Sequence, residues 1–350
     1  MIMLYEYELG KAADILVREL FKLKPGETFI ITADTESSPR VVDATARAAF
    51  SAGAKPMVIW LASPHGVGKA ADPMLPVEAL TAALKETDAW VEFNNQWLLY
   101  STPFNIASRE NKKLRYLNLV GMNPDMMVRC IGRVNYPVLG RFLETFREMT
   151  VKAKHFRTTT PAGGELEFDN PPVFTDRTPL AKGYADKPGV YMMAGQISWT
   201  PDLKTINGVL VFDGSVVPPI GKLNEPIQLH IEAGEIVKIE GGTEARKFEQ
   251  WLKSFNHAQM LRLAHTAWSF NPGAKLTGDI VEDERVWGSS EWGIGHISAL
   301  HSPPDGVSAP SHTDGICLNT SAWLDGRQIL DRGQLTDEKL RALAKELGKA

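Results

Sequence analysis

The feature that most constrains this chain is an alternation of apolar runs with amphipathic helical segments over roughly its first 150 residues. Strands are expected at 29–34, 56–62, 88–94 and 114–121, and helices at 9–23, 37–54 and 76–88. The runs at 29–34 and 56–62 are mostly apolar, which predicts strands that are buried on both faces. Buried strands that alternate with helices predict a parallel α/β sheet.

The pattern changes near Thr150, where glycine-containing turns begin to separate short strand-like runs. A hairpin is expected around Pro161 to Gly164, and one clear helix covers Thr243 to Phe255. We therefore predict two domains. The first, 1–140, is an α/β domain with a mostly parallel sheet, and the second, 141–350, is a β-rich α+β domain.

Composition excludes several classes of protein. Of 350 residues, 43% are hydrophobic and 23% charged, as in soluble globular proteins. The net charge is −4 without a basic block, which gives no support to a nucleic-acid partner. No signal peptide or membrane-spanning segment is recognisable. The two cysteines, Cys130 and Cys317, lie far apart in the sequence, which favours a reducing cytoplasm over a disulfide framework.

A histidine and an aspartate stand two residues apart in PSHTDGICL, at His312 and Asp314. If the segment is a strand, both side chains point to the same face and converge, as metal ligands do. If it is a loop, the aspartate simply caps a turn. The spacing alone leaves both interpretations open.

Histidines are concentrated near this pair, since four of the eight lie between His265 and His312. Imidazole combines with a carboxylate in the facial triad of mononuclear iron sites. His265 lies in the mostly apolar run LAHTAWSFNPGAK, which suits a ligand in a dry pocket or a neutral core histidine. His296 lies among glycines that allow close backbone approach, and His301 is expected in a loop.

Acidic residues supply two further candidates. Glu244 either points inward from the start of a helix or favours the dipole at the N-terminus of that helix. Glu282, Asp283 and Glu284 form a run that is expected to be a solvated turn.

Several stretches, in their order along the chain, resemble the aminopeptidase T-like metallopeptidase superfamily, and within it the 2,5-dihydroxypyridine 5,6-dioxygenases. The matching stretches are KGYADKPG (182–189), NGVLVFDGSVVPP (207–219), residues 229–245, AHTAWSFNP (264–272) and SHTDG (311–315). The N-terminal half matches more weakly, chiefly through LLYSTPFN (98–105). The order and spacing of these motifs indicate the superfamily.

The resemblance implies an α/β domain followed by a largely antiparallel β domain that binds the metal, assembled as a homo-oligomer. It implies that His265, His312 and Asp314 bind one metal and leave open positions on it. Glu244 and His296 match two ligands of the peptidases, whereas the tyrosine ligand of the peptidases is absent. Fe(II) is the first expectation for the metal, with Mn(II) or Zn(II) as alternatives.

The favoured hypothesis is a ring-cleaving dioxygenase that joins O₂ to a hydroxylated aromatic or N-heteroaromatic compound. His296 or Tyr100 would transfer protons, and Tyr100 stands where these dioxygenases have a histidine. Trp268, Phe270 and Trp292 either stack on the substrate ring or pack in the core.

The alternative hypothesis is a metal-dependent hydrolase of the aminopeptidase T type. In that enzyme Glu244 or His296 would act as the base toward a metal-activated water. Only the dioxygenase requires O₂, so oxygen dependence separates the two reactions. A third hypothesis is a non-catalytic binding protein on the same fold.

Overall fold

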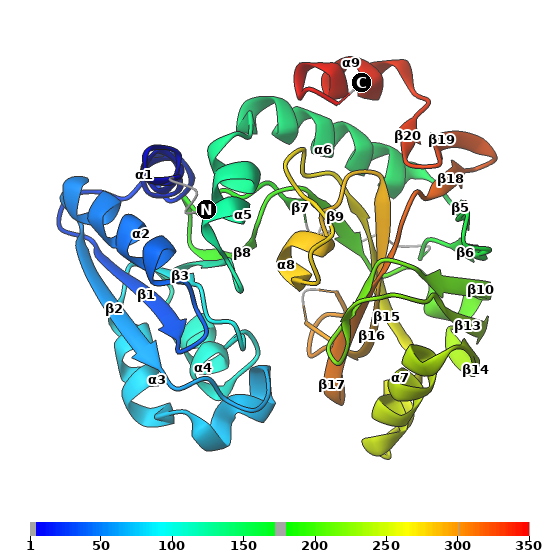
Figure 1. The fold of residues 1–350 in the computed structure, drawn as a ribbon, viewed down its shortest axis with the longest axis horizontal. Helices are drawn as coiled ribbons and strands as arrows, with labels where there is room; N and C mark the ends of the chain where they lie inside the picture. Colours follow the sequence, from blue (N-terminus) through cyan, green and yellow to red (C-terminus); the bar gives the residue numbers. More distant parts are fainter. Residues whose placement is uncertain (1–4, 172–179, 300, 350) are drawn as a thin grey trace. The chain divides into compact units, whose positions relative to one another are not determined.

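The structure is a computed structural model that describes residues 5–171, 180–299 and 301–349 (Figure 1). The chain divides into two compact units. The first unit comprises Met1–Val134 and Ala181–Ala194, and the second comprises Asn135–Leu180 and Gly195–Ala350. A segment of the second half therefore returns to the first unit, which the predicted division after residue 140 does not include. Among the described residues, none of the helices has both the length and the apolarity that a membrane span requires.

The first unit is built on a five-stranded parallel sheet with the strand order β2-β1-β3-β4-β8. Its strands are β1 (Thr28–Asp34), β2 (Lys55–Leu61), β3 (Ala89–Glu92), β4 (Arg115–Asn118) and β8 (Gly189–Met192). Its α-helices are α1 (Glu6–Asp14), α2 (Pro39–Ser51), α3 (Val77–Glu86), α4 (Thr102–Glu110) and α5 (Pro124–Met127). This topology confirms the predicted parallel α/β half.

One expectation for this sheet is wrong. The run at 56–62 forms β2, which is the edge strand of the sheet rather than a buried one. Its apolar side chains Met57, Val58 and Trp60 are exposed. An apolar run predicts a strand but does not say which position the strand takes in the sheet.

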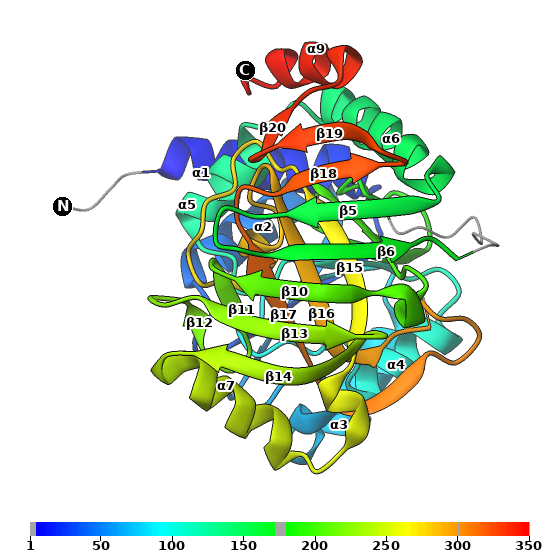
Figure 2. The ribbon, with the colours of Figure 1, turned by 90° about the vertical axis from the view of Figure 1, so that its right-hand side faces the viewer.

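The second unit packs two largely antiparallel sheets face to face. The first has eight strands in the order β14-β13-β10-β6-β5-β18-β19-β20, and Figure 2 shows it facing the viewer. Its strands are β5 (His155–Thr159), β6 (Glu165–Asp169), β10 (Asn207–Phe212), β13 (Ile227–Glu232), β14 (Glu235–Gly241), β18 (Ser321–Leu324), β19 (Arg327–Asp331) and β20 (Gln334–Leu335). These sheets confirm the predicted β-rich half.

The other sheet of this unit has seven strands in the order β12-β11-β17-β16-β15-β9-β7. In Figure 2 its strands β15, β16 and β17 run behind the eight-stranded sheet and across it. The strands are β7 (Leu180–Ala181), β9 (Gln196–Trp199), β11 (Ser215–Val217), β12 (Gly221–Lys222), β15 (Leu263–Ser269), β16 (Ser289–Ile297) and β17 (Val307–Cys317). The unit's α-helices are α6 (Tyr136–Lys152), α7 (Thr243–Ser254), α8 (Ile280–Asp283) and α9 (Glu338–Glu346).

The seven-stranded sheet has one apolar face and one polar face, because successive side chains along a strand point in opposite directions. On the apolar face, the ring centroid of Trp292 lies 5.3 Å from that of Phe168 in the facing sheet. Trp268 lies 5.2 Å from Trp199 on the neighbouring strand β9, measured in the same way. The alternate residues of the same strands, including His265 on β15, point to the polar face.

In the first unit, Glu92 ends β3 with its side chain fully buried. Its carboxylate accepts hydrogen bonds from the Tyr116 hydroxyl and from the Leu98 backbone N–H. Burial raises the pKa of Glu92 from 4.5 to about 7. The charged form of this carboxyl is therefore less favourable in the folded chain than in the unfolded chain.

We predict that Glu92 lowers the free energy of unfolding as the pH rises from about 4.5 to about 7. The unfolded state releases this proton first, so stability falls across that window by on the order of 3 kcal/mol. Urea unfolding at about pH 5 and about pH 8 measures the difference. Glu92→Gln, which cannot ionise, is expected to lose most of this pH dependence. An identical pH dependence in the variant would contradict the assignment.

Candidate metal site

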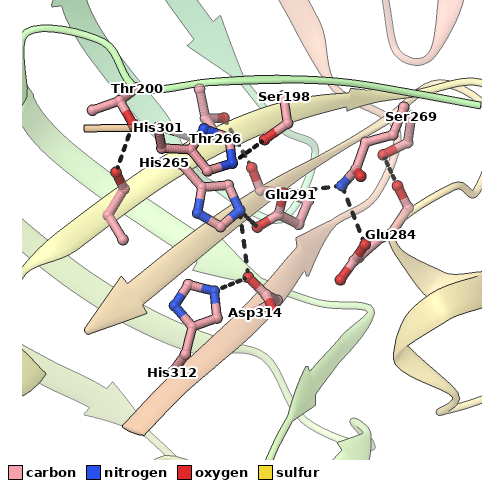
Figure 3. Close-up of polar contacts among 12 residues, drawn as sticks. Ser198, Thr200, His265, Thr266, Ser269, Glu284, Glu291, His301, His312 and Asp314 are labelled. Atoms are coloured by element: carbon pink, nitrogen blue, oxygen red, sulfur yellow. Dashed lines mark hydrogen bonds and ion pairs between the residues drawn. The ribbon is translucent and has the colours of Figure 1, made fainter. Parts of the chain in front are cut away.

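Three side chains converge on the polar face of the seven-stranded sheet (Figure 3). His265 comes from β15, and His312 and Asp314 come from β17. One potential ligand atom from each lies within 4.8 Å of the others. The Nε2 atom of His312 lies 2.9 Å from Oδ1 of Asp314, and Nε2 of His265 lies 3.6 Å from the same oxygen. The His-x-Asp pair thus lies in a strand, and its two side chains share a face.

Strand β16 runs between the two ligand-bearing strands, and a glycine occupies the position between the ligands. Gly293 pairs with His265 on one side and with Asp314 on the other. A Cβ atom at this position would lie 2.4 Å from Cε1 of His265 and 3.0 Å from Cε1 of His312. The first distance is shorter than any ordinary van der Waals contact, and the second is at the lower limit of such contacts. The two imidazoles therefore occupy the space that a side chain would fill.

The protonation states of these groups suit a cation. Burial lowers the pKa of His265 to about 4, so this imidazole is neutral at pH 7 and offers a lone pair. Burial acts to raise the pKa of Asp314, but the neighbouring His312 outweighs it and the pKa falls to about 2. The pKa of His312 is raised, because Asp314 more than offsets the effect of burial. A metal at this point would compete with a proton for Nε2 of His312.

His296 contributes to the site through its backbone. The Nδ1–H group of His312 donates a hydrogen bond to the carbonyl oxygen of His296, at 2.7 Å. This contact fixes the tautomer and aims Nε2 of His312 at Asp314, as partners of metal-binding histidines do. Within the described residues, the converging set contains His265, His312 and Asp314, and the imidazole of His296 is not part of it.

Glu291 was not predicted as a site residue, and it lies on the polar face two residues before Gly293. Its side chain is fully buried, and Oε1 lies 3.2 Å from Nε2 of His265. Burial raises the pKa of Glu291 well above its usual value, and the charges of Asp314 and Glu284 raise it further. The surroundings of Glu291 therefore favour the uncharged form of its carboxyl. The signal available in the sequence was the two-residue spacing along β16.

His301 was expected to be an ordinary loop residue, but it contacts the site. Its ring stacks on that of His265, with centroids 4.7 Å apart and an interplanar angle of 7°. Its Nε2 atom lies 3.4 Å from Oγ of Ser198, and its buried Nδ1 atom has no hydrogen-bond partner among the described residues. No spacing pattern in the sequence predicts this contact, because it depends on how the turn after β16 folds back.

The aromatic residues proposed as substrate contacts lie elsewhere, and this is a correction. Trp268, Phe270 and Trp292 are at most 1% exposed and belong to the core. Trp268 stands three residues after His265 on the same strand, so the two side chains point to opposite faces. Trp292 is adjacent to Gly293 and therefore also points away from the ligands.

Two acidic candidates also have structural partners. Glu244 lies in the first turn of α7, and its carboxylate accepts hydrogen bonds from the Asn224 backbone and side chain and from the Glu225 backbone, all within 3.0 Å. It is not part of the converging set. The prediction that 282–284 forms a solvated turn is wrong, since the side chains of Glu282 and Asp283 are fully buried.

Tyr100, the candidate for proton transfer, belongs to the first unit. It precedes α4 with a left-handed backbone conformation at φ 70°. Its ring lies edge-on to that of Phe104, with centroids 6.1 Å apart. These contacts describe its own unit, and its proposed role stays a prediction.

Comparison with known proteins identifies the relatives of this chain. The profile of the family described as 2,5-dihydroxypyridine 5,6-dioxygenase matches residues 16–337. A curated 2,5-dihydroxypyridine 5,6-dioxygenase from Pseudomonas putida is 34% identical over 166 residues, which is 44% of this chain and 47% of the relative. The aligned part thus spans about half the length of that relative.

Two solved structures share the fold. The 2,5-dihydroxypyridine dioxygenase of Pseudomonas putida KT2440 superimposes with a TM-score of 0.77 at 21% identity, covering 95% of this chain and 98% of the other. The wild-type AmpT of Thermus thermophilus gives a TM-score of 0.65 at 15% identity, covering 95% of this chain and 100% of the other. At these identities the likeness shows the fold alone.

We predict that Gly293→Ala weakens metal binding at least about tenfold, because the added methyl group displaces the His265 ring. Calorimetric titration with Mn(II) or Zn(II) measures the affinity. Gly140→Ala is the matched control, since a Cβ at this position on α6 meets nothing within 4 Å. Binding by Gly293→Ala that equals the wild type would show that the imidazoles do not need this space.

Proposed function

Because the chain belongs to the 2,5-dihydroxypyridine 5,6-dioxygenase family, we propose that it is a ring-cleaving dioxygenase. Its substrate would be a hydroxylated aromatic or N-heteroaromatic compound, with O₂ as the second substrate. The observation that carries the proposal is the convergence of His265, His312 and Asp314. Two histidines and one carboxylate are the donor set of mononuclear non-haem Fe(II) oxygenases.

We propose Fe(II) as the metal, with Mn(II) or Zn(II) as alternatives. The donor set fits such an ion, since it combines two imidazoles with the ionised carboxylate of Asp314. A bound Fe(II) would supply open coordination positions and the redox chemistry that ring opening with O₂ requires. The raised pKa of Glu291 favours its uncharged form, which limits the negative charge of the site.

The protein itself orients the ligand side chains and limits the access of water to the site. The carbonyl of His296 holds the ring of His312, and Gly293 lets both imidazoles approach the sheet. His265 and Asp314 are buried, which limits the access of water and strengthens electrostatic interactions at the site. Rigid positioning of this kind keeps two reactants in contact long enough to react.

We further propose a cytoplasmic, homo-oligomeric enzyme. Both cysteines, Cys130 and Cys317, are free and buried, which suits a reducing compartment. The small-molecule substrate and O₂ are the only reactants that the proposed chemistry needs.

The proposal predicts that His312→Ala and Asp314→Ala lose bound metal and activity while the fold stays intact, because an open catalytic site seldom stabilises the whole domain. Metal content is measured after anaerobic loading with Fe(II), and folding by circular dichroism. The matched control is His155→Ala, which breaks an exposed His155–Asp169 pair of similar geometry, 2.8 Å long.

Activity is tested by O₂ consumption with hydroxypyridines and catechol-like acids. The wild type loaded with Fe(II) is expected to consume O₂ only in the presence of such a ring, and to lose turnover under nitrogen. Hydrolysis of small peptides with Zn(II), independent of oxygen, would contradict the dioxygenase. Full metal content in both ligand variants would show that the ligands are assigned wrongly.

We propose that Tyr100 or the His296 imidazole assists proton transfer. Tyr100→Phe removes a hydroxyl, a group that can donate a hydrogen bond but is a poor base near neutral pH. The variant is expected to keep its metal and to lose about tenfold or more in kcat. Steady-state kinetics beside metal analysis checks this, and an unchanged kcat would remove Tyr100 from the mechanism.

A further inference from the structure

The edge strand β2 leaves apolar side chains uncovered on both faces of the sheet in the first unit. Met57 and Trp60 are 41% and 46% exposed, and Val58 is 37% exposed. Met57 points to one face, while Val58 and Trp60 point to the other, because they alternate along the strand. Natural edge strands are normally short, charged or covered. This one has seven residues, of which only Lys55 is charged.

The outer edge of β2 also carries backbone groups that the sheet does not use. The Lys55 N–H donates to the Glu27 carbonyl at 2.7 Å, toward β1. Backbone groups alternate in direction along a strand, so those of Val58 and Trp60 point outward, away from β1. Pro56 also lies on the outward side but has no N–H group to offer, as is typical of edge strands.

We propose that β2 is the surface through which two copies of this chain associate, by antiparallel pairing of β2 with β2 about a two-fold axis at Ile59. This register places Val58 of each copy opposite Trp60 of the other. Residues in such a pair exchange both backbone hydrogen bonds, so the axis generates four bonds. An axis at Val58 would instead place Trp60 opposite Pro56, which has no donor.

The side chains agree with this register. On one face, the Trp60 ring of each copy lies beside Val58 of the other, which is a favourable aromatic and β-branched pair. On the other face, Met57 of each copy lies opposite Leu61 of the other, and the two Ile59 residues lie opposite each other. The one charged residue, Lys55, falls outside the paired segment, so no like charges face each other.

The covering helices also fit the arrangement. Helix α2 contacts both β1 and β2. Strands lie about 4.8 Å apart in a sheet. A helix that lies over β1 and β2 would therefore be about 10 Å from the α2 helix of the other copy when the two β2 strands pair. This is the spacing at which helices pack.

The exposed apolar side chains of β2 supply part of the area that a stable dimer needs. Met57, Val58 and Trp60 together expose roughly 250 Å² of surface per copy, taking on the order of 200 Å² for each side chain. A standard interface buries about 800 Å² per partner, so these three residues supply about a third of it.

The experiment measures the mass of the full chain by light scattering after gel filtration. The wild type is expected to be a dimer or a higher even assembly, and Val58→Pro to fall to half that mass or less. Proline at this position removes an outward N–H group that does not point toward β1, together with the valine side chain that would contact Trp60. Trp60→Glu serves the same purpose if Val58→Pro does not fold. Val237→Glu is the control, since Val237 is 50% exposed on another edge strand, β14, and is expected to keep the wild-type mass.

The register has its own test. Ile59→Cys places two cysteines across the axis with Cα atoms about 4.5 Å apart, within disulfide reach. This variant is expected to form a covalent dimer under mild oxidant, whereas Met57→Cys is not. The native cysteines are buried and do not compete. A monomeric wild type, an unchanged mass in the folded Val58 or Trp60 variant, or cross-linking of Met57→Cys without Ile59→Cys would overturn the proposal.

Discussion

The two-residue period of the seven-stranded sheet is the constraint on which the second unit depends. The same strands present Trp268 and Trp292 to the core and His265 and Glu291 to the opposite side. Moving one strand by a single residue would exchange the two sets and destroy both the core and the ligand cluster. Stability and chemistry are therefore specified together, because the packing that fixes the register also places the ligands.

Charge in the site is balanced by burial rather than by counter-ions alone. Asp314 is ionised beside His312, whereas burial raises the pKa of Glu291 well above its usual value. Farther along the polar face, the pKa of Glu284 is raised to about 7 by burial, although Arg285 lies 2.9 Å away. A second ionised carboxylate that is buried without a cation would be costly, so the raised pKa of Glu291 limits the negative charge that faces the two imidazoles.

Much of this organisation is readable from the sequence, and the failures have identifiable physical causes. Alternating periodicity located the parallel sheet, and the spacing of His312 and Asp314 suggested that both face one way. The periodicity of the sequence did not show that the strand at 56–62 lies at the edge of the parallel sheet, because strand order depends on contacts between distant segments. The position of Trp268 was predictable, because it stands three residues after His265. The contact of His301 with His265 was not predictable, because it arises from the path of the turn after β16.

The ligand-bearing residues belong to adjacent strands of a hydrogen-bonded ladder, with Gly293 between them. An apo form of such a site retains its geometry, so capture of the ion costs little conformational entropy. Exchange of one metal for another would then leave the positions of the ligand side chains nearly unchanged. Selectivity among cations would in that case be set by the cell's supply and by the donor atoms rather than by folding of the protein around a preferred ion.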